Sequence, residues 1–252
     1  MGTRNLLVSD LDGTLLGDDA ALARFAEWLE ARRANVRLVY ASGRRFDSIV
    51  ESINATELPE PDVIVAGVGT EVRWFAGGET LPFWHNRLAR RWDARGASAA
   101  LAHFDDLRRQ PAESQSEFKV SYHAEQLPAS RLRAIRGALM SAGLSAEVVY
   151  SSDRDLDIVP AGAGKGAAAS FLAEYWQLPA ERVLVSGDSG NDLTMFLRGF
   201  RGIVVANAHP ELKALAGPNV FRSRFAFADG VLDGLRYWLD EFGESPRYTA
   251  FP

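Results

Sequence analysis

At three points of the chain a strand-like apolar run ends directly before a polar, glycine-containing segment. These segments are DLDGT at Asp10 to Thr14, ASGR at Ala41 to Arg44, and GDSGND at Gly187 to Asp192. The carboxyl ends of parallel strands meet at one edge of a sheet, so we expect the three segments to lie close together. This arrangement predicts an α/β fold with a single site at that edge.

Strand-like and helix-like stretches alternate over most of the sequence. The pattern predicts a doubly wound parallel sheet with helices on both faces. The expected strands of this core are 6–8, 36–40, 61–66, 182–186 and 202–205, and the expected helices are 18–33, 46–55, 165–176 and 192–197. A chain of 252 residues, 47% of them hydrophobic, can bury such a core and still form a second, smaller domain.

The alternation changes between residues 81 and 160, which predicts an inserted α+β cap domain. The core domain then consists of 1–80 and 161–252, and the cap of 81–160. In the cap we expect strands at 118–122, 147–150 and 156–159 and a helix at 129–142. The basic run from Arg87 to Arg95 is interpreted as the solvated face of one amphipathic helix.

Asp10 and Asp12 are expected at the end of the first strand. Alternate residues of a strand project to the same side, so both carboxylates can address one reaction centre. We assign Asp10 as a nucleophile that forms an aspartyl-phosphate intermediate, and Asp12 as the acid and base that serves the leaving group and then the attacking water. Taken alone, Asp-Xaa-Asp-Gly would also fit a calcium-type loop or a simple turn.

The segment GDSGND adds a second acidic cluster after another strand-like run. Oxygen ligands from two such clusters suit a hard divalent cation, and we predict one shared Mg²⁺ site. The proposed ligands are Asp10, Asp12, Asp188 and Asp192. Asn191, in the turn between the last two, is placed at the substrate.

Lys165 and Ser42 complete the predicted catalytic set. Lys165 lies between glycines at the start of an alanine-rich helix and would supply a fixed positive charge for phosphoryl oxygens. The Ser42 hydroxyl, with the backbone amides of Gly43 and Arg44, could hold the phosphate. Each residue has a plainer alternative, a solvated lysine or a serine that caps a turn.

These motifs, in this order, resemble those of the haloacid dehalogenase superfamily of phosphatases. The resemblance implies Asp10 as nucleophile, Asp12 as acid and base, Ser42 and Lys165 as phosphate-binding residues, and Asp188 as a magnesium ligand supported by Asp192. Threonine is more common in that superfamily where this chain has Ser42, and both residues provide a hydroxyl.

The whole chain is also similar to the sucrose-phosphatase family. The similarity rests on GVGTEV at Gly67 to Val72, KVSYH at Lys119 to His123 and SSDRDLDIVP at Ser151 to Pro160. It implies a magnesium-dependent hydrolysis of sucrose 6-phosphate, a step of sucrose biosynthesis. It also suggests that Lys119, Tyr122 and His123 face the sugar, and that Gly69, Thr70, Asp153 and Asp157 help to form the pocket between cap and core.

Two alternatives to this function stay open. Mannosylfructose-phosphate phosphatase is a related enzyme with similar SSDRDLDI and GDSGND segments, and other sugar-phosphate phosphatases follow it. The chain could instead be a non-enzymatic regulatory partner of a sucrose-phosphate synthase. The presence of Asp10, Asp12, Lys165 and Asp188 favours an enzyme.

Composition excludes several other classes of protein. The net charge of −5 argues against extensive binding of nucleic acid, and the absence of cysteine excludes disulfides and thiolate metal sites. No apolar stretch reaches the roughly 20 residues of a membrane span, and we see no signal peptide at the N-terminus. We therefore expect a cytoplasmic monomer that acts on a small disaccharide phosphate.

Overall fold

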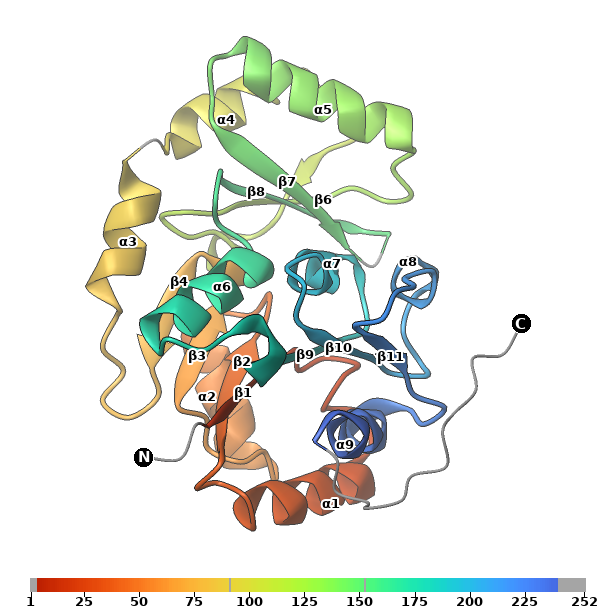
Figure 1. Cartoon of the computed structure of the whole chain (residues 1–252). Helices are drawn as coiled ribbons and strands as arrows, with labels where there is room; N and C mark the ends of the chain where they lie inside the picture. The colour runs from red at the N-terminus through yellow and green to blue at the C-terminus, as the bar shows by residue number, and fades with distance from the viewer. Residues whose placement is uncertain (1–3, 91, 152, 240–252) are drawn as a thin grey trace.

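Two β-sheets organise the computed structural model of the chain, which describes residues 4–90, 92–151 and 153–239. A seven-stranded sheet forms the core and a four-stranded sheet forms the smaller unit above it (Figure 1). The strands of the smaller sheet all lie between residues 108 and 160, inside the predicted insertion. The α/β core with an inserted α+β cap is thereby confirmed, whereas the exact domain boundaries stay a prediction.

The core sheet has the strand order β11-β10-β9-β1-β2-β3-β4, and all neighbours are parallel except β3 and β4. Its strands are β1 (Asn5–Ser9), β2 (Val36–Ala41), β3 (Val63–Ala66), β4 (Glu71–Trp74), β9 (Val183–Gly187), β10 (Arg201–Val204) and β11 (Val220–Arg222). The central strands are apolar without alternation and almost completely buried, because both of their faces are covered. In this order β1 lies between β2 and β9, which end at the segments ASGR and GDSGND.

Helices cover this sheet. They are α1 (Asp19–Glu30), α2 (Phe46–Ala55), α6 (Lys165–Tyr175), α7 (Leu193–Phe196), α8 (Pro210–Lys213) and α9 (Phe227–Trp238). Asp18 caps α1 by accepting a hydrogen bond from the amide of Ala21, and the apolar stripe of α1 includes Phe25 and Leu29, both fully buried. Helices α1 and α9 pack on each other at the end of the molecule away from the cap (Figure 1). A membrane span would need a longer and more apolar helix than any in the described ranges.

The cap contains an antiparallel sheet of order β5-β6-β8-β7 under two helices. Its elements are α4 (Ala94–Ala100), β5 (Arg108–Arg109), β6 (Val120–His123), α5 (Ala129–Ser141), β7 (Ala146–Ser151) and β8 (Asp155–Pro160), whereas α3 (Pro82–Ala89) buries Trp84 and Leu88 in the apolar cluster of the core. Helices α4 and α5 lie on the outer side of the sheet (Figure 1). Leu101, Ile135 and Leu156 belong to a buried apolar cluster separate from that of the core. The inner face of the sheet is left to face the core domain.

The single helix expected over the basic run 87–95 is wrong. Helix α3 ends at Ala89, and α4 begins at Ala94 after Asp93, whose carboxylate accepts a hydrogen bond from the amide of Gly96. An aspartate cap of this kind starts a new helix because it satisfies amides that have no partner inside the helix. The segment 192–197 is also shorter in α-helix than expected, since a 3₁₀ turn (Gly190–Asp192) precedes α7.

Candidate active site

The three polar segments meet where strands β9, β1 and β2 end. In the core sheet, Ser9 of β1 pairs with Tyr40 of β2 on one side and with Ser186 of β9 on the other. Asp10, Ser42 and Asp188 come one or two residues later in the chain, so they lie at almost the same height along the strand direction. The amide of Asp10 donates to the carbonyl of Ser186 over 3.0 Å, which continues the pairing one step beyond β1. The expected convergence of these segments is confirmed.

Lys165 is fully buried and ties together the acidic groups at this edge. It is the first residue of α6, and its ammonium donates to Asp10 Oδ1 at 2.6 Å, Asp192 Oδ1 at 2.7 Å and Asn191 Oδ1 at 2.9 Å. All three N–H groups of the ammonium therefore have acceptors. Burial opposes the charged form of Lys165, but Asp10 and Asp192 outweigh it and raise the pKa of Lys165 above its ordinary value.

Asp10, Asp188 and Asp192 form a buried cluster of carboxylates. One oxygen from each lies within 4.8 Å of the others. Burial raises the pKa of Asp10 to about 7 despite the opposing charge of Lys165, and burial together with Asp10 raises the pKa of Asp188 to about 6. Burial and the short distances between the carboxylates therefore oppose their ionisation. A cation bound in the cluster would favour the ionised forms.

This donor set fits Mg²⁺, which prefers carboxylate oxygens and retains several waters. Both oxygens of Asp192 already accept hydrogen bonds: Oδ1 from Lys165, and Oδ2 from the amides of Asp188 at 3.0 Å and Ser189 at 3.1 Å. Asp192 is thus suited to fix the loop and the lysine, while Asp10 and Asp188 face the pocket. Gly13 makes room for Asp188, since a Cβ on Gly13 would lie 2.4 Å from Asp188 Oδ2.

Asp12 points away from the carboxylate cluster and toward Arg44. Arg44 Nε donates to Asp12 Oδ2 over 2.7 Å, and a second N–H group of the same guanidinium donates to Oδ1. The Asp12 side chain is 53% exposed and lines the pocket. The assignment of its carboxylate as a metal ligand needs correction, because that carboxylate pairs with an arginine. Its position at the pocket is compatible with the predicted acid and base role.

Ser42 and Gly43, the residues predicted to bind phosphate, line the pocket. Ser42 is buried, and its hydroxyl accepts a hydrogen bond from the backbone amide of Arg44 over 3.1 Å, which turns the 42–44 loop toward Asp10. The Ser42 hydroxyl also retains its own proton as a donor. Gly69 and Thr70 lie behind this loop rather than on the pocket surface. A Cβ on Gly69 would approach the Gly164 backbone to 2.2 Å, so Gly69 allows the segment that carries Lys165 to pack closely, while the Thr70 hydroxyl donates to the carbonyl of Gly67 over 2.8 Å.

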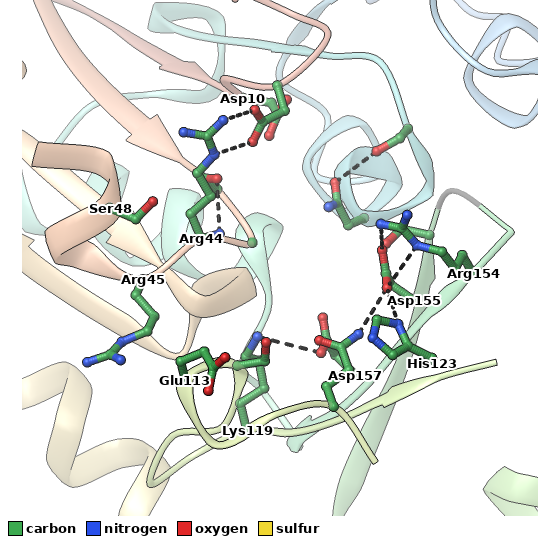
Figure 2. A pocket seen from close by; sticks show the side chains of 18 of the residues that line it. Asp10, Arg44, Arg45, Ser48, Glu113, Lys119, His123, Arg154, Asp155 and Asp157 are labelled. Atoms are coloured by element: carbon green, nitrogen blue, oxygen red, sulfur yellow. Dashed lines mark hydrogen bonds and ion pairs between the residues drawn. The ribbon is translucent and has the colours of Figure 1, made fainter. Parts of the chain in front are cut away.

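A pocket of about 820 Å³ separates the core edge from the cap. Figure 2 shows Asp10 and Arg44 on one side of it and Lys119, Asp157 and His123 on the other. Lys119 and Asp157 are nearly buried, and Lys119 Nζ lies 3.6 Å from Asp157 Oδ1. The two groups form a long ion pair in which burial raises the pKa of Asp157 and the charge of Lys119 partly offsets the rise. An ammonium with three N–H groups can still donate to an acceptor in the pocket.

The residues predicted to bind the substrate or to form its pocket divide into two groups. The pocket is lined by Gly43, Arg44, Lys119, His123, Asp157 and Asn191. Tyr122 instead belongs to the apolar cluster of the cap, because alternation along β6 points it to the opposite face of the sheet from Lys119 and His123. Asp153 is exposed in the turn before β8, at a φ of 49°, and does not line the pocket. The placement of Tyr122 and Asp153 at the substrate is thus corrected.

Asp155 is a pocket residue that the sequence analysis missed. Its Oδ1 accepts a hydrogen bond from Gln110 Nε2 over 2.9 Å and lies 3.3 Å from His123 Nδ1, while Oδ2 accepts from Arg154 over 3.0 Å. The expected strand began at Leu156, one residue too late. Asp155 shares a face of β8 with Asp157 because the two are separated by one residue, and this period of two was the signal available.

Sequence comparison relates the chain to several phosphatases. The model of the family described as sucrose-6F-phosphate phosphohydrolase matches residues 3–239. A mannosylfructose-phosphate phosphatase from Agrobacterium fabrum is 38% identical, over 96% of this chain and 98% of the relative. Probable sucrose-phosphatase 3a from Arabidopsis thaliana is 32% identical over 97% of this chain, which spans only 62% of the plant protein.

Solved structures show the same architecture. The sucrose-phosphatase from Synechocystis, determined in complex with sucrose and phosphate, superposes with a TM-score of 0.89 and 31% identity, over 94% of this chain and 98% of that protein. A haloacid dehalogenase-like hydrolase from Bacillus subtilis superposes with a TM-score of 0.69 at 19% identity, over 95% of this chain and 93% of its own, a likeness of fold alone.

Proposed function

The chain belongs to the sucrose-6F-phosphate phosphohydrolase family of haloacid dehalogenase-like phosphatases, and from this premise we propose that it is a magnesium-dependent phosphatase of a disaccharide phosphate. One observation carries the proposal. The buried Asp10 carboxylate, held by Lys165, opens into a pocket whose opposite wall is polar and belongs to the cap. Phosphoryl chemistry and sugar recognition can therefore take place in one enclosed space.

The proposed reaction starts with the phosphate between Asp10 and the 42–44 loop. The Asp10 oxygen attacks phosphorus, the bond from phosphorus to the sugar oxygen breaks, and Asp12 gives that oxygen a proton. Asp12 then takes a proton from the water that hydrolyses the aspartyl phosphate, which returns Asp10. Lys165 and the Ser42 hydroxyl stabilise the phosphoryl oxygens throughout.

Asp10 and Asp188 are the residues that would hold Mg²⁺, with Asp192 fixing the loop that carries Asp188. The bound ion would supply Lewis-acid stabilisation of the charge on the phosphoryl oxygens.

Metal binding is expected to raise the melting temperature of the protein. With Mg²⁺ at roughly 100 times its dissociation constant, mass action adds about 2.7 kcal/mol, which corresponds to about 5 to 10 °C for a chain of this size. The change Asp188→Asn should remove most of this increase, whereas Asp105→Asn, at an exposed position of the cap, should retain it. A melting curve that is the same in Mg²⁺ and in chelator would contradict the assignment of the site.

Sucrose 6-phosphate is the first candidate substrate. The match to the family model over residues 3–239 and the overall likeness to the Synechocystis sucrose-phosphatase support it. Mannosylfructose phosphate is the second candidate, supported by the 38% identity to the Agrobacterium enzyme over nearly the full length of both chains. The two disaccharides differ modestly in one sugar ring, and both present hydroxyl groups to the cap wall.

Lys119 is expected to contribute to recognition of the sugar. We predict that Lys119→Met raises the KM for the disaccharide phosphate about tenfold or more, since hydrogen bonds to charged groups contribute about 1.5 to 3 kcal/mol. Turnover of p-nitrophenyl phosphate, which is too small to reach across the pocket, should change little. Lys213→Met, at an exposed position on α8, is the matched control, and equal KM values for the two variants would disprove this role of Lys119.

Phosphate release tests the proposed function as a whole. Sucrose 6-phosphate, mannosylfructose phosphate, fructose 6-phosphate and glucose 6-phosphate are compared, each with Mg²⁺ and with chelator. We expect metal-dependent release with the highest kcat/KM for one of the two disaccharide phosphates. Equal rates on the hexose phosphates would reject the disaccharide assignment. No release from any substrate would favour the alternative of a regulatory partner that binds a sucrose-phosphate synthase.

A further inference from the structure

Ser121 lies behind the cap wall of the pocket. It is completely buried, and it is not one of the residues that line the pocket. Its hydroxyl lies 2.5 Å from Asp157 Oδ1 and 3.1 Å from the carbonyl oxygen of Ser114, and the shorter contact makes Asp157 the principal acceptor. Asp157 does line the pocket and is only 8% exposed. Ser121 therefore reaches the pocket through residues that line it, and among these Asp157 takes its shortest hydrogen bond.

The orientation of Asp157 also determines the surroundings of Lys119. Asp157 Oδ1 is the atom that faces both partners, Ser121 Oγ at 2.5 Å and Lys119 Nζ at 3.6 Å. A nearly buried carboxylate held by a hydroxyl on one side can offset the charge of the lysine at this long separation and leave N–H groups of the ammonium for a ligand. If the hydroxyl were removed, the carboxylate would be free to turn and form a direct hydrogen bond with Lys119.

Gln115 fixes the backbone of Ser121. Its side-chain Oε1 accepts from the amide of Ser121 over 2.9 Å, and its Nε2 donates to the carbonyl oxygens of Ser121 at 3.0 Å and Gln110 at 2.9 Å. The side-chain amide thereby makes the two hydrogen bonds that a peptide group of a neighbouring strand would make. Gln115 belongs to the 110–116 segment between β5 and β6 and is not a pocket residue either.

We propose that Ser121 and Gln115 are positioning residues for substrate recognition, Gln115 by fixing Ser121 and Ser121 by orienting Asp157 beside Lys119. This inference rests on the proposed disaccharide phosphatase function and names the part of the cap that prepares the sugar side of that site. Neither residue touches the reacting atoms, so their contribution belongs to binding of the sugar and not to transfer of the phosphoryl group.

The test compares Ser121→Ala, Ser121→Thr, Gln115→Met and the control Ser141→Ala, which lies at the exposed end of α5. Loss of the Ser121 hydrogen bond to the carboxylate should raise the KM for the preferred disaccharide phosphate about tenfold in Ser121→Ala, and Gln115→Met, which releases the backbone of Ser121, should raise the same KM. The kcat for that substrate and both constants for p-nitrophenyl phosphate should stay within about twofold. Ser121→Thr keeps a hydroxyl at this position, so its KM should be close to that of the wild type. Ser141→Ala should have the KM of the wild type.

Two kinetic outcomes would overturn the proposal. One is an unchanged KM in Ser121→Ala. The other is an equal loss on both substrates together with a lower melting temperature, which would assign Ser121 to stability alone. A crystal structure of Ser121→Ala gives an answer independent of turnover, since the Asp157 carboxylate should leave its present position, and an unmoved carboxylate would reject the idea. A wild-type protein without preference for disaccharide phosphates would instead reject the proposed function, which is a separate result.

Discussion

Asp10→Asn is expected to abolish phosphatase activity, with kcat reduced by about 10⁴-fold or more, because the amide cannot attack phosphorus. The variant should still fold. The side-chain oxygen of the introduced amide can accept the hydrogen bond that Lys165 Nζ now donates to Asp10 Oδ1 at 2.6 Å. Phosphate release and thermal unfolding, measured on the same preparations, separate these two effects.

The raised pKa of Asp10 sets the expected stability of this variant. Burial raises that pKa to about 7, so in metal-free protein the ionised form is less favourable in the folded state than in the unfolded state. The stability contributed by the protonated carboxyl is present below pH about 4 and is lost as the pH rises toward 7. A neutral asparagine is not subject to this loss. At pH 8 in chelator, the melting temperature of Asp10→Asn should therefore lie at most about 3 °C below that of the wild type. Asp10→Asn with wild-type phosphate release would exclude the covalent mechanism.

Lys165→Met is expected to remove both activity and stability. Without the ammonium, the buried carboxylates of Asp10 and Asp192 lose the cation that offsets their charges. Removing one partner of a buried ion pair destabilises a protein by about 3 to 5 kcal/mol, so the melting temperature at pH 8 should fall by about 10 °C. Activity should fall at least about 10³-fold, since a positive charge facing the phosphoryl oxygens is also lost.

The stability deficit of Lys165→Met should depend on pH in a definite direction. Lys165 lowers the pKa of both Asp10 and Asp192, so its removal leaves two carboxyl groups whose pKa values are raised further by burial. Carboxyl groups with raised pKa values destabilise the folded state as the pH increases and not as it decreases. In chelator, the difference in melting temperature from the wild type should therefore be smaller at pH 5 than at pH 8. Lys213→Met provides the control, and a deficit that grows toward pH 5 would contradict the ion-pair explanation.

The core site could be predicted from the sequence because its determinants are local. Asp10, Ser42 and Asp188 each follow an apolar strand, and parallel pairing of β1 with β2 and β9 brings the strand ends together. To predict this site it is enough to know that the strands are buried and that neighbouring strands are parallel. The order of the outer strands, including the antiparallel edge strand β4, depends on contacts between distant segments that no local pattern specifies.

The cap site was harder to predict because it depends on single-residue alternation. The predicted strand starts one residue late and so omits Asp155. Asp153, predicted to help form the pocket, lies instead in the turn before the strand, with a φ of 49°. Tyr122 follows the alternation of β6 into the apolar cluster of the cap. Its neighbour Ser121 makes its decisive contact with Asp157 on another strand, 36 positions away.

The pairing of Asp12 with Arg44 shows a second limit. The two residues lie 32 positions apart, and each was expected to face a ligand rather than the other. Side-chain partners of this kind depend on rotamers and on the position of neighbouring loops, which composition and periodicity do not determine. A phosphate bound at the 42–44 loop would compete with Asp12 for the Arg44 guanidinium.

The central claim is that Asp10 receives the phosphoryl group, and a rapid-quench experiment tests it most directly. Wild-type enzyme and Asp12→Asn are mixed with ³²P-labelled disaccharide phosphate and Mg²⁺, quenched in acid within the first turnover and digested for peptide mapping. We expect label on the peptide that contains Asp10, removed by hydroxylamine as an acyl phosphate would be, accumulated in Asp12→Asn and absent in Asp10→Asn. Product formation in the wild type with no labelled protein at any time, or label on a different residue, would contradict the account.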